Sequence, residues 1–485
     1  MQLPFISRIN PKKLIAIGTL GACLSAGLLV IQAQGSASST NFAMLASTPT
    51  GTAASLKALC RDEDNNKDFA KALIDCTNAI KSDPKFPDAY YYRGLVYYDT
   101  FQPDKAITDF DQAIALDPKY TDAYLYRGLS YYDKNDYDHA IADYDIALTL
   151  DPHYAYAYYD RARAYSDKGD KVHANIDFNQ AINEFTSRIG KDSTDSVAYD
   201  GRGRAYRRIG SYDKAIEDYT QAITLDPKYT DAFNDRGLAY YDQNDYEKAI
   251  ADYTQAITLD PNYEVGYQNR GNAYYDQGDY DKAIADLSQA IKLSPNNADP
   301  YNTRGLAYYQ KGDYDHALPD FTQAIKLNPN LTAAWDNRGL TYRRQKNYDK
   351  ALADYNKSIT INPQNALAYN GRGLTYYFKG DDDHAIADFN TSITIDPKNA
   401  ETYDDRGLAY FDKAIYDLAL TDFTQAIKLD PKYDWAYVDR GDTYAKQGHC
   451  AQAKADYEQA LTITPDFKAA KDGLTKLQSA TNCLK

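Results

Sequence analysis

Hydrophobic and polar positions repeat along most of this chain with a period of 34 residues. One arginine marks each period, at Arg93, Arg127, Arg161, Arg202, Arg236, Arg270, Arg304, Arg338, Arg372, Arg406 and Arg440. All steps between these arginines are 34 residues, except one of 41 between Arg161 and Arg202. A period of this length is typical of solenoids, in which each unit buries its hydrophobic face against its neighbours.

Each period predicts two α-helices. In the copy from Asp231 to Pro261, Tyr240 and Tyr253 belong to aromatic positions that recur with helical spacing. Gly237 and Ala249 in the same copy are small, so that two helices can approach closely. A proline usually follows the second helix and ends it, although the extended unit has Thr186 at that position. Residues that can cap the second helix are Asp136, Ser211, Asp245, Asp279, Asp313 and Asn347.

This pattern resembles the tetratricopeptide repeat family. The likeness covers Ala53 to Asp466, which is twelve copies when a degenerate first copy is counted. The resemblance implies an all-α fold, a right-handed superhelical solenoid of antiparallel helix pairs. In this family the first helix of each pair lines a concave groove and the second lies outside. We therefore expect repeat units over residues 53–467, followed by a capping helix and tail at residues 468–485.

The step of 41 residues extends the fourth unit by seven residues, at about residues 185–196. Seven residues are about two helical turns, so the second helix of this unit could run longer with its buried face preserved. The alternative is a surface loop, which Gly190 and the Ser/Thr content of this stretch favour.

The N-terminus has a different pattern. Residues Leu14 to Gln32 carry no charge, and basic residues precede them. This pattern predicts that residues 1–37 are a cleaved export signal or an N-terminal membrane anchor, with the anchor at residues 14–32. Lipid attachment at Cys23 is a third alternative. Residues 38–52 then form a flexible spacer, and the body of the protein is expected outside the cytoplasm, periplasmic or secreted.

Charge and composition narrow the function. The formal net charge of −15 repels nucleic acid. The sequence contains no nucleophile elbow, phosphate loop or metal-binding motif, so we expect no catalysis, no cofactor and no metal. Four histidines occupy one repeated surface position where other copies have lysine, namely His139, His173, His316 and His384.

The residue directly after the arginine of each period is usually glycine, and we call this position the glycine slot. The expected partner-binding residues lie on the first helix, four positions after the glycine slot. Most of them are tyrosines, of which the chain contains 48. These residues are Tyr98, Tyr132, Arg207, Tyr241, Tyr275, Tyr309, Arg343, Tyr377 and Phe411. The next residue is mostly acidic; the exceptions are Arg208 and Arg344, which we also expect to bind the partner. An aromatic track edged by carboxylates favours a basic or hydroxyl-rich ligand. Arg163 and Arg204, directly after the glycine slot, are a second basic pair that could take an acidic ligand.

Three functions fit this surface. The family implies a non-catalytic scaffold that binds peptides or proteins in the groove. The alternatives are a carbohydrate-binding module of the cell envelope, and a structural spacer in which the tyrosines only pack. Exposure of Tyr275 and Tyr309 separates binding from packing, because a ring that binds a ligand must be accessible.

An arginine directly before the glycine slot accompanies an aspartate sixteen residues later, as in Arg236 with Asp252. We expect charged pairs between the two helices, within a unit or across to its neighbour. We expect water to screen these pairs in part, so that each contributes about 0.5–1 kcal/mol and serves register more than bulk stability.

Four cysteines predict disulfides at the two ends of the array. Cys60 occupies the glycine slot of the first unit and Cys76 the aromatic slot that faces it. Cys450 begins the last outer helix, and Cys483 follows the capping helix. In an oxidising compartment each pair can form a bridge; the alternative is four ordinary thiols.

Overall fold

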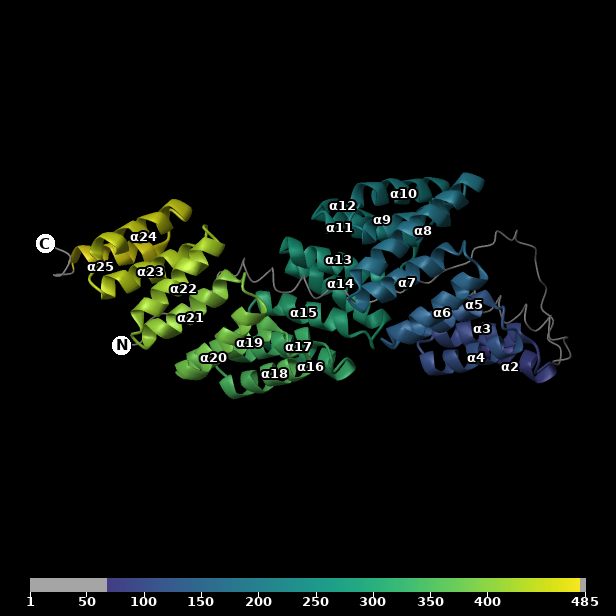
Figure 1. Ribbon diagram of the computed structural model, residues 1–485, viewed down its shortest axis with the longest axis horizontal. Helices are drawn as coiled ribbons and strands as arrows, with labels where there is room; N and C mark the ends of the chain where they lie inside the picture. Colours follow the sequence, from purple (N-terminus) through teal and green to yellow (C-terminus); the bar gives the residue numbers. More distant parts are fainter. Residues whose placement is uncertain (1–67, 480–485) are drawn as a thin grey trace. The chain divides into compact units, whose positions relative to one another are not determined.

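The computed structural model describes residues 68–479, and every regular element in that range is an α-helix (Figure 1). The predicted signal or anchor, the spacer, Cys23, Cys60 and Cys483 lie outside the described residues. The chain divides between Tyr263 and Glu264 into two compact units. We call residues 68–263 the N-terminal unit and residues 264–479 the C-terminal unit, and we describe each by itself.

Helix pairs follow one another in both units. In the N-terminal unit the first helices are α3 (Pro87–Asp99), α5 (Thr121–Asp133), α7 (Ala155–Asp167), α9 (Ser196–Arg208) and α11 (Thr230–Asp242). Its second helices are α2 (Phe69–Ser82), α4 (Pro103–Leu116), α6 (Tyr137–Leu150), α8 (Lys171–Lys191), α10 (Tyr212–Leu225) and α12 (Tyr246–Leu259). The predicted all-α solenoid of helix pairs is confirmed.

The C-terminal unit continues the pattern. Its first helices are α13 (Glu264–Gln277), α15 (Ala298–Gln310), α17 (Thr332–Arg344), α19 (Ala366–Lys379), α21 (Ala400–Asp412) and α23 (Asp434–Lys446). Its second helices are α14 (Tyr280–Leu293), α16 (Tyr314–Leu327), α18 (Tyr348–Ile361), α20 (Asp382–Ile395), α22 (Tyr416–Leu429) and α24 (Cys450–Ile463). The capping helix α25 (Lys468–Ser479) packs against α23 and α24.

First helices form the inner face of each unit. Within each unit, a helix packs mainly on the other helix of its pair and on the next helix along the chain, and successive first helices also touch each other, as α9 does α11 and α15 does α17. Among the described residues, successive second helices do not pack against each other to the extent that successive first helices do. The first helices therefore lie on the inner side of the array within each unit. We call the surface they form the inner face.

The glycine slot allows each helix pair to close. At Gly305 an added Cβ would lie 2.7 Å from a ring carbon of Phe321, which is fully buried on the second helix. Such a distance is far inside van der Waals contact, so only glycine lets α15 and α16 pack at this spacing. The same arrangement joins Gly237 to Tyr253, where the distance would be 2.6 Å.

The turn between the two helices of a pair needs a left-handed residue. Glycine supplies this conformation in six copies, at Gly169, Gly210, Gly278, Gly312, Gly380 and Gly448. The other five copies use Phe101, Asn135, Asn244, Lys346 and Ala414, with φ between 57° and 61°. Asparagine tolerates this region, whereas the other three residue types are strained there.

The seven additional residues of the fourth unit lengthen a helix and do not form a loop. Helix α8 has 21 residues where the other second helices have 14. Phe185 in the added part is fully buried, packs edge-on against Tyr156 at 5.0 Å, and faces Gly201. Two added turns return the apolar stripe to the same face, so Gly190 is accommodated within the helix.

Four of the six predicted caps are confirmed. The side chains of Asp136, Asp245, Asp279 and Asp313 accept a hydrogen bond from the backbone three residues later. Ser211 and Asn347 stand at the N-cap position without such a bond.

Candidate functional site

One arginine–aspartate pair joins the two helices of every complete repeat. Arg304 donates from Nε and a terminal nitrogen to the two carboxylate oxygens of Asp320, at 2.8 and 2.7 Å. The remaining nitrogen of Arg304 donates to Ser288 of the preceding repeat at 2.9 Å. The expected charged pair thus forms within the repeat, and its arginine also reaches the neighbouring repeat. Asp320 is only 6% exposed while the side chain of Arg304 is 19% exposed, so water reaches this pair mainly from the arginine side.

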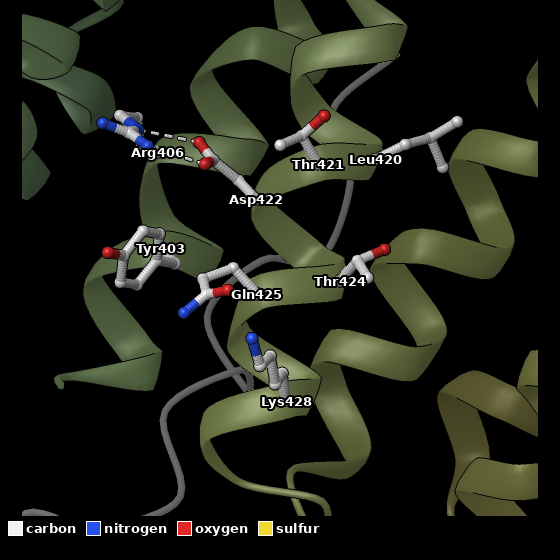
Figure 2. Close-up of a pocket in the computed structure, with 8 residues that line it drawn as sticks. All are labelled: Tyr403, Arg406, Leu420, Thr421, Asp422, Thr424, Gln425 and Lys428. Atoms are coloured by element: carbon white, nitrogen blue, oxygen red, sulfur yellow. Dashed lines mark hydrogen bonds and ion pairs between the residues drawn. The ribbon is translucent and has the colours of Figure 1, made fainter. Parts of the chain in front are cut away.

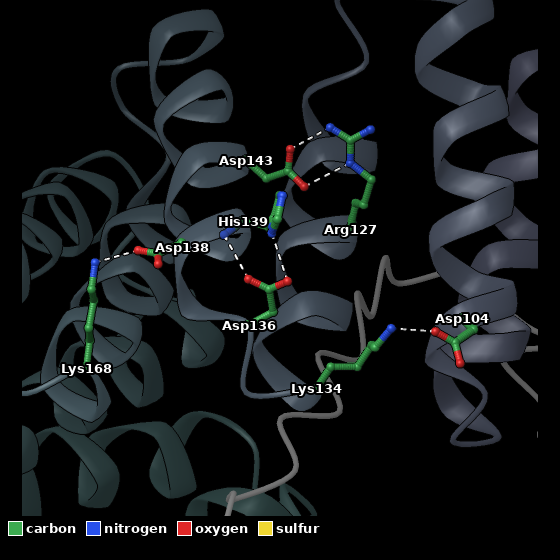
Figure 3. A network of polar contacts seen from close by, with 8 residues as sticks. All are labelled: Asp104, Arg127, Lys134, Asp136, Asp138, His139, Asp143 and Lys168. Carbon is green, nitrogen blue, oxygen red and sulfur yellow. Dashed lines mark hydrogen bonds and ion pairs between the residues drawn. The ribbon is translucent and has the colours of Figure 1, made fainter.

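Figure 3 shows the same contacts in the N-terminal unit, with Arg127 paired to Asp143 and Lys134 reaching Asp104 of the preceding repeat at 2.5 Å. His139 contacts the capping Asp136 at 2.8 Å through Nδ1 and stacks on Tyr131. His173, His316 and His384 make the same two contacts, with another tyrosine in each case. These histidines are exposed and support a helix cap, as expected for a surface position.

The predicted aromatic track is largely a packing feature. Tyr275 is 5% exposed and Tyr309 is 7% exposed. Tyr132 and Arg343 are buried as well. By the criterion of exposure these four residues pack between helices and do not present a free surface. The other predicted track residues are half-buried, namely Tyr98, Arg207, Tyr241, Arg344, Tyr377 and Phe411; Arg208 is exposed.

A contact between neighbouring repeats explains the conserved spacing of this track within the chain. The track residue of one repeat contacts the residue 35 positions later, which is the residue directly after the track position of the next repeat. Tyr377, for example, donates a hydrogen bond to Asp412 at 2.7 Å. Arg207 pairs with Asp242 at 2.7 Å, and Arg344 donates to the hydroxyl of Tyr309 at 2.9 Å. In these repeats the acidic residues beside the predicted track therefore accept hydrogen bonds from track residues of the preceding repeat, as Asp412 and Asp242 do.

The second predicted basic pair is neutralised inside the protein. Arg163 is 5% exposed, donates to Asp160 at 3.0 Å, and lies over the ring of Tyr132 at 4.5 Å. Arg204 donates to Asp235 and lies 3.0 Å from the carboxylate of Asp200. Both guanidinium groups already have a carboxylate partner within the protein, which disfavours an acidic ligand at these two positions.

Buried polar groups on the inner face remain without a hydrogen-bond partner within the protein. Among the described residues they include Asp160 Oδ2, Arg163 Nε, Asp200 Oδ1, Asp336 Oδ1 and Arg343 Nε. Arg163 and Arg343 are among the residues that the sequence singles out, whereas the three aspartates are not. The aspartates stand two or three residues before the glycine slot, and this position is the only sequence feature that they share.

Burial changes the acidity of several of these carboxyl groups. Burial raises the pKa of Asp336 to about 7, against hydrogen bonds from Ser358 and Asn365 that lower it. Burial also raises the pKa of Asp405 to about 7, opposed by a hydrogen bond from Asn370 at 2.8 Å. At neutral pH these two groups therefore hold their protons part of the time.

A shallow open depression lies between α21 and α22 (Figure 2). Its lining includes Tyr403, Arg406, Asp422, Gln425 and Lys428, and Figure 2 shows Arg406 and Asp422 joined by the hydrogen bonds found in every complete repeat. Because this pair is a structural element of the repeat, the depression by itself indicates no ligand.

Cys76 and Cys450 are both disulfide-bonded. Their expected partners, Cys60 and Cys483, lie outside the described residues, so the pairing stays a prediction. Within residues 68–479 no three His, Cys, Asp or Glu residues are placed to hold a metal ion. A search of the same range for membrane-spanning helices finds none of sufficient length and hydrophobicity.

Repeated helix pairs of this kind, with small residues at the closest approach, define a helical-repeat protein. A sequence model of the TPR repeat matches residues 128–169, 203–243, 237–278, 271–312 and 415–448. Three further tetratricopeptide repeat models match residues 302–366 and 337–400, residues 87–120, and residues 436–467. Together these matches cover well over half of the chain, which belongs to the tetratricopeptide repeat family.

Several solved structures are similar in fold. The Cut9–Hcn1 hetero-tetramer of APC/C matches at 16% identity and a TM-score of 0.45, covering 88% of this chain and 96% of that chain. YrrB, a TPR protein with an unusual peptide-binding site, matches at 25% identity and a TM-score of 0.34, covering 41% and 99%. A tetratricopeptide repeat protein from Parabacteroides merdae matches at 22% identity and a TM-score of 0.44, covering 51% and 98%. The search of curated proteins found no match.

Proposed function

We propose that this protein is a non-catalytic scaffold that binds a peptide or protein partner along the inner face of its helical repeats. The observation that carries the proposal is the inner face that successive first helices form within each unit of this tetratricopeptide repeat chain. Helical-repeat proteins use extended surfaces of this kind to bind their partners. A peptide supplies N–H donors and C=O acceptors along its whole length.

A basic partner fits this face best. Aspartates stand five residues before the arginine of the glycine slot on three first helices of the N-terminal unit, at Asp88, Asp122 and Asp231. The main arginines nearby, Arg163, Arg204 and Arg207, already have carboxylate partners. Because these arginines are already paired, the inner face attracts a basic ligand more strongly than an acidic one. No observation favours a glycan, because the rings expected to stack on sugars are buried or paired with neighbouring repeats.

We further propose that the body of the protein works outside the cytoplasm. The disulfide bonds of Cys76 and Cys450 support this, because structural disulfides persist in oxidising compartments. The apolar segment at residues 14–32 is the sequence feature that supports it.

Affinity capture with the full chain tests the scaffold. The inner-face variant combines Asp122→Lys with Asp231→Lys, and the matched control combines Glu217→Lys with Glu247→Lys on exposed positions of the second helices. Both variants change the net charge equally. We expect defined partner proteins with the wild type and the control, and their loss with the inner-face variant. Capture of nothing, or of the same proteins by all three forms, would favour a structural spacer.

A further inference from the structure

Two arginines occupy the same position of the repeat, four residues after the glycine slot, but only one of them has a carboxylate partner. Arg207 of α9 pairs with Asp242, 35 residues later, at 2.7 Å. The residue 35 positions after Arg343 of α17 is Phe378, and the guanidinium carbon of Arg343 lies 5.7 Å from the centre of that ring. Within the described residues Arg343 forms no ion pair. The repeat pattern thus supplies a counterion to Arg207 and not to Arg343.

The positive charge of Arg343 is buried. Its side chain is 7% exposed, and its Nε has no hydrogen-bond partner within the protein. Burial raises the pKa of the Tyr355 hydroxyl, and the charge of Arg343 and a hydrogen bond with it oppose this; the neutral hydroxyl does not offset the charge. Burial also raises the pKa of Asp405, and Arg343 opposes this less than the hydrogen bond from Asn370 does, without forming an ion pair. A buried guanidinium without a counterion is unfavourable, and an aromatic ring compensates it only weakly.

The next residue, Arg344, adds a second guanidinium group. It is half-buried, and its Nε donates to the hydroxyl of Tyr309 at 2.9 Å. In residues 68–479 it also forms no ion pair. The equivalent residues of the preceding and following repeats are Gln310 and Phe378, whereas most repeats have aspartate at this position. Three successive first helices, α15, α17 and α19, therefore lack the carboxylate that elsewhere stands beside the track.

We propose that Arg343 and Arg344 form a subsite for a carboxylate group of the partner. This inference rests on the proposed function and identifies one contact of its ligand. The ring of Phe378 lies on Arg343 and is itself 37% exposed, so a rotation of this side chain gives a ligand access to the guanidinium. The ligand carboxylate would then stand beside Arg343 as Asp242 stands beside Arg207, and accept charge-assisted hydrogen bonds from the two arginines.

The net charge of the chain makes this subsite easy to distinguish from general attraction. With a formal charge of −15 the protein repels acidic peptides as a whole, so binding of one requires a local cationic site. The preference for a basic ligand rests on aspartates and paired arginines of the N-terminal unit. A carboxylate subsite in the C-terminal unit adds one acidic group to the partner that the inner face as a whole would select.

Three short fluorescent peptides, titrated with the full chain by anisotropy, test the ligand. One alternates glutamate and alanine and has blocked ends, the second alternates glutamine and alanine and has a free C-terminal carboxylate, and the third is the second with both ends blocked. We expect a carboxylate peptide to bind at least about tenfold more tightly than the third. Binding of the first peptide identifies an acidic side chain as the ligand group, and binding of the second identifies a chain end.

Phe378→Asp tests the site by restoring the carboxylate that this repeat lacks. The new aspartate should pair with Arg343 as Asp242 does with Arg207, so we expect an intact fold by circular dichroism and binding weakened about tenfold or more. The matched control is Leu367→Asp, which adds the same charge to the same helix at a residue that is 38% exposed. It should alter the affinity by less than about twofold.

Arg343→Met separates binding from a structural role. The substitution removes a charge that the fold does not neutralise, so we expect binding to weaken about tenfold or more while the melting temperature stays equal or rises. Arg207→Met is the matched control at the same repeat position. It leaves Asp242 without its partner, so it should lower the melting temperature.

Equal weakening by Phe378→Asp and Leu367→Asp would overturn the subsite, since it would show repulsion by added charge alone. A fall in melting temperature in Arg343→Met as large as in Arg207→Met would overturn it too, because Arg343 would then be a structural residue. Equal binding of all three peptides would show that no carboxylate is recognised. If neither carboxylate peptide binds while inner-face capture of partners succeeds, the subsite is wrong and the scaffold function stands. Failure of both experiments would remove the scaffold function as well.

Discussion

Arg304 holds the carboxylate of Asp320 with two parallel hydrogen bonds of 2.8 and 2.7 Å while its third nitrogen reaches the preceding repeat. The guanidinium also lies over the ring of Tyr301 at 5.7 Å. One side chain therefore ties together the two helices of its own repeat and the junction to the repeat before it.

Replacing Arg304 should cost much more than a surface ion pair. Arg304→Leu leaves the carboxylate of Asp320 buried without its partner, so we expect a loss of about 3 kcal/mol in the free energy of unfolding. Arg304→Lys keeps the charge and should lose less, although lysine cannot bind the carboxylate through two parallel bonds. Urea unfolding of the three proteins measures both effects. A loss below about 1 kcal/mol in Arg304→Leu would mean that water screens the pair after all.

Tyr309→Phe tests whether the predicted track is structural. The substitution removes the hydroxyl that accepts a hydrogen bond from Arg344, so we expect a loss of about 1 kcal/mol in stability. Tyr308→Phe is the matched control, because no hydrogen bond of that hydroxyl is found within the described residues. Thermal unfolding should separate the two variants. Equal melting temperatures would argue that the contact between repeats contributes nothing.

Ala414→Gly should stabilise the protein. Ala414 has a φ of 58° in the turn between α21 and α22, a conformation that glycine provides in six other repeats. Relief of this strain should add about 1 kcal/mol, reduced by the greater entropy that glycine has in the unfolded chain. Melting temperature by circular dichroism is the measurement, and Gly380→Ala is the reverse control, expected to lower it. A lower melting temperature in Ala414→Gly would contradict the assignment of strain.

The stability of the C-terminal unit should depend on the protonation of Asp336. Its folded pKa of about 7 lies above the value of an unfolded aspartate, so the folded state binds the proton more tightly. The stability gained from the protonated group is therefore fully present below about pH 4, and it is lost as the pH rises to about 7 and the group must ionise in the buried site. Asp336→Asn should therefore narrow the difference in melting temperature between about pH 5 and pH 8. The same difference in both proteins would show that Asp336 is ionised without cost.

Removing either disulfide should loosen one end of the array. Cys76→Ala or Cys450→Ala should each lower the stability by about 2–4 kcal/mol, and a reducing agent should have no further effect on the double variant. Peptide mapping by mass spectrometry tests the partners. Bridges from Cys76 to a cysteine other than Cys60, or from Cys450 to one other than Cys483, would refute the predicted pairing.

The sequence alone was sufficient for the architecture of this protein. The 34-residue period, the small residue at positions such as Gly237 and the proline after most second helices each recur many times, so local propensity and helix packing agree in most copies. The same repetition predicted the arginine–aspartate pairs and the capping role of residues such as Asp136. These features depend on contacts within one repeat, where residue spacing determines which side chains meet.

Only the tertiary structure decided which inner-face residues are accessible. Tyr275 and Tyr309 occupy the first-helix positions expected to bind a ligand, yet stacking of the next repeat buries their rings. The sequence suggests that Arg204 is a free cation, but in the structure Asp200 of α9 and Asp235 of α11 lie next to it. The sequence also did not decide whether the seven added residues lengthen α8 or form a loop. The burial of Phe185, which only the tertiary structure shows, distinguishes the two. Burial and pairing between repeats depend on the rotation of one helix pair on the next, which the spacing within a repeat does not specify.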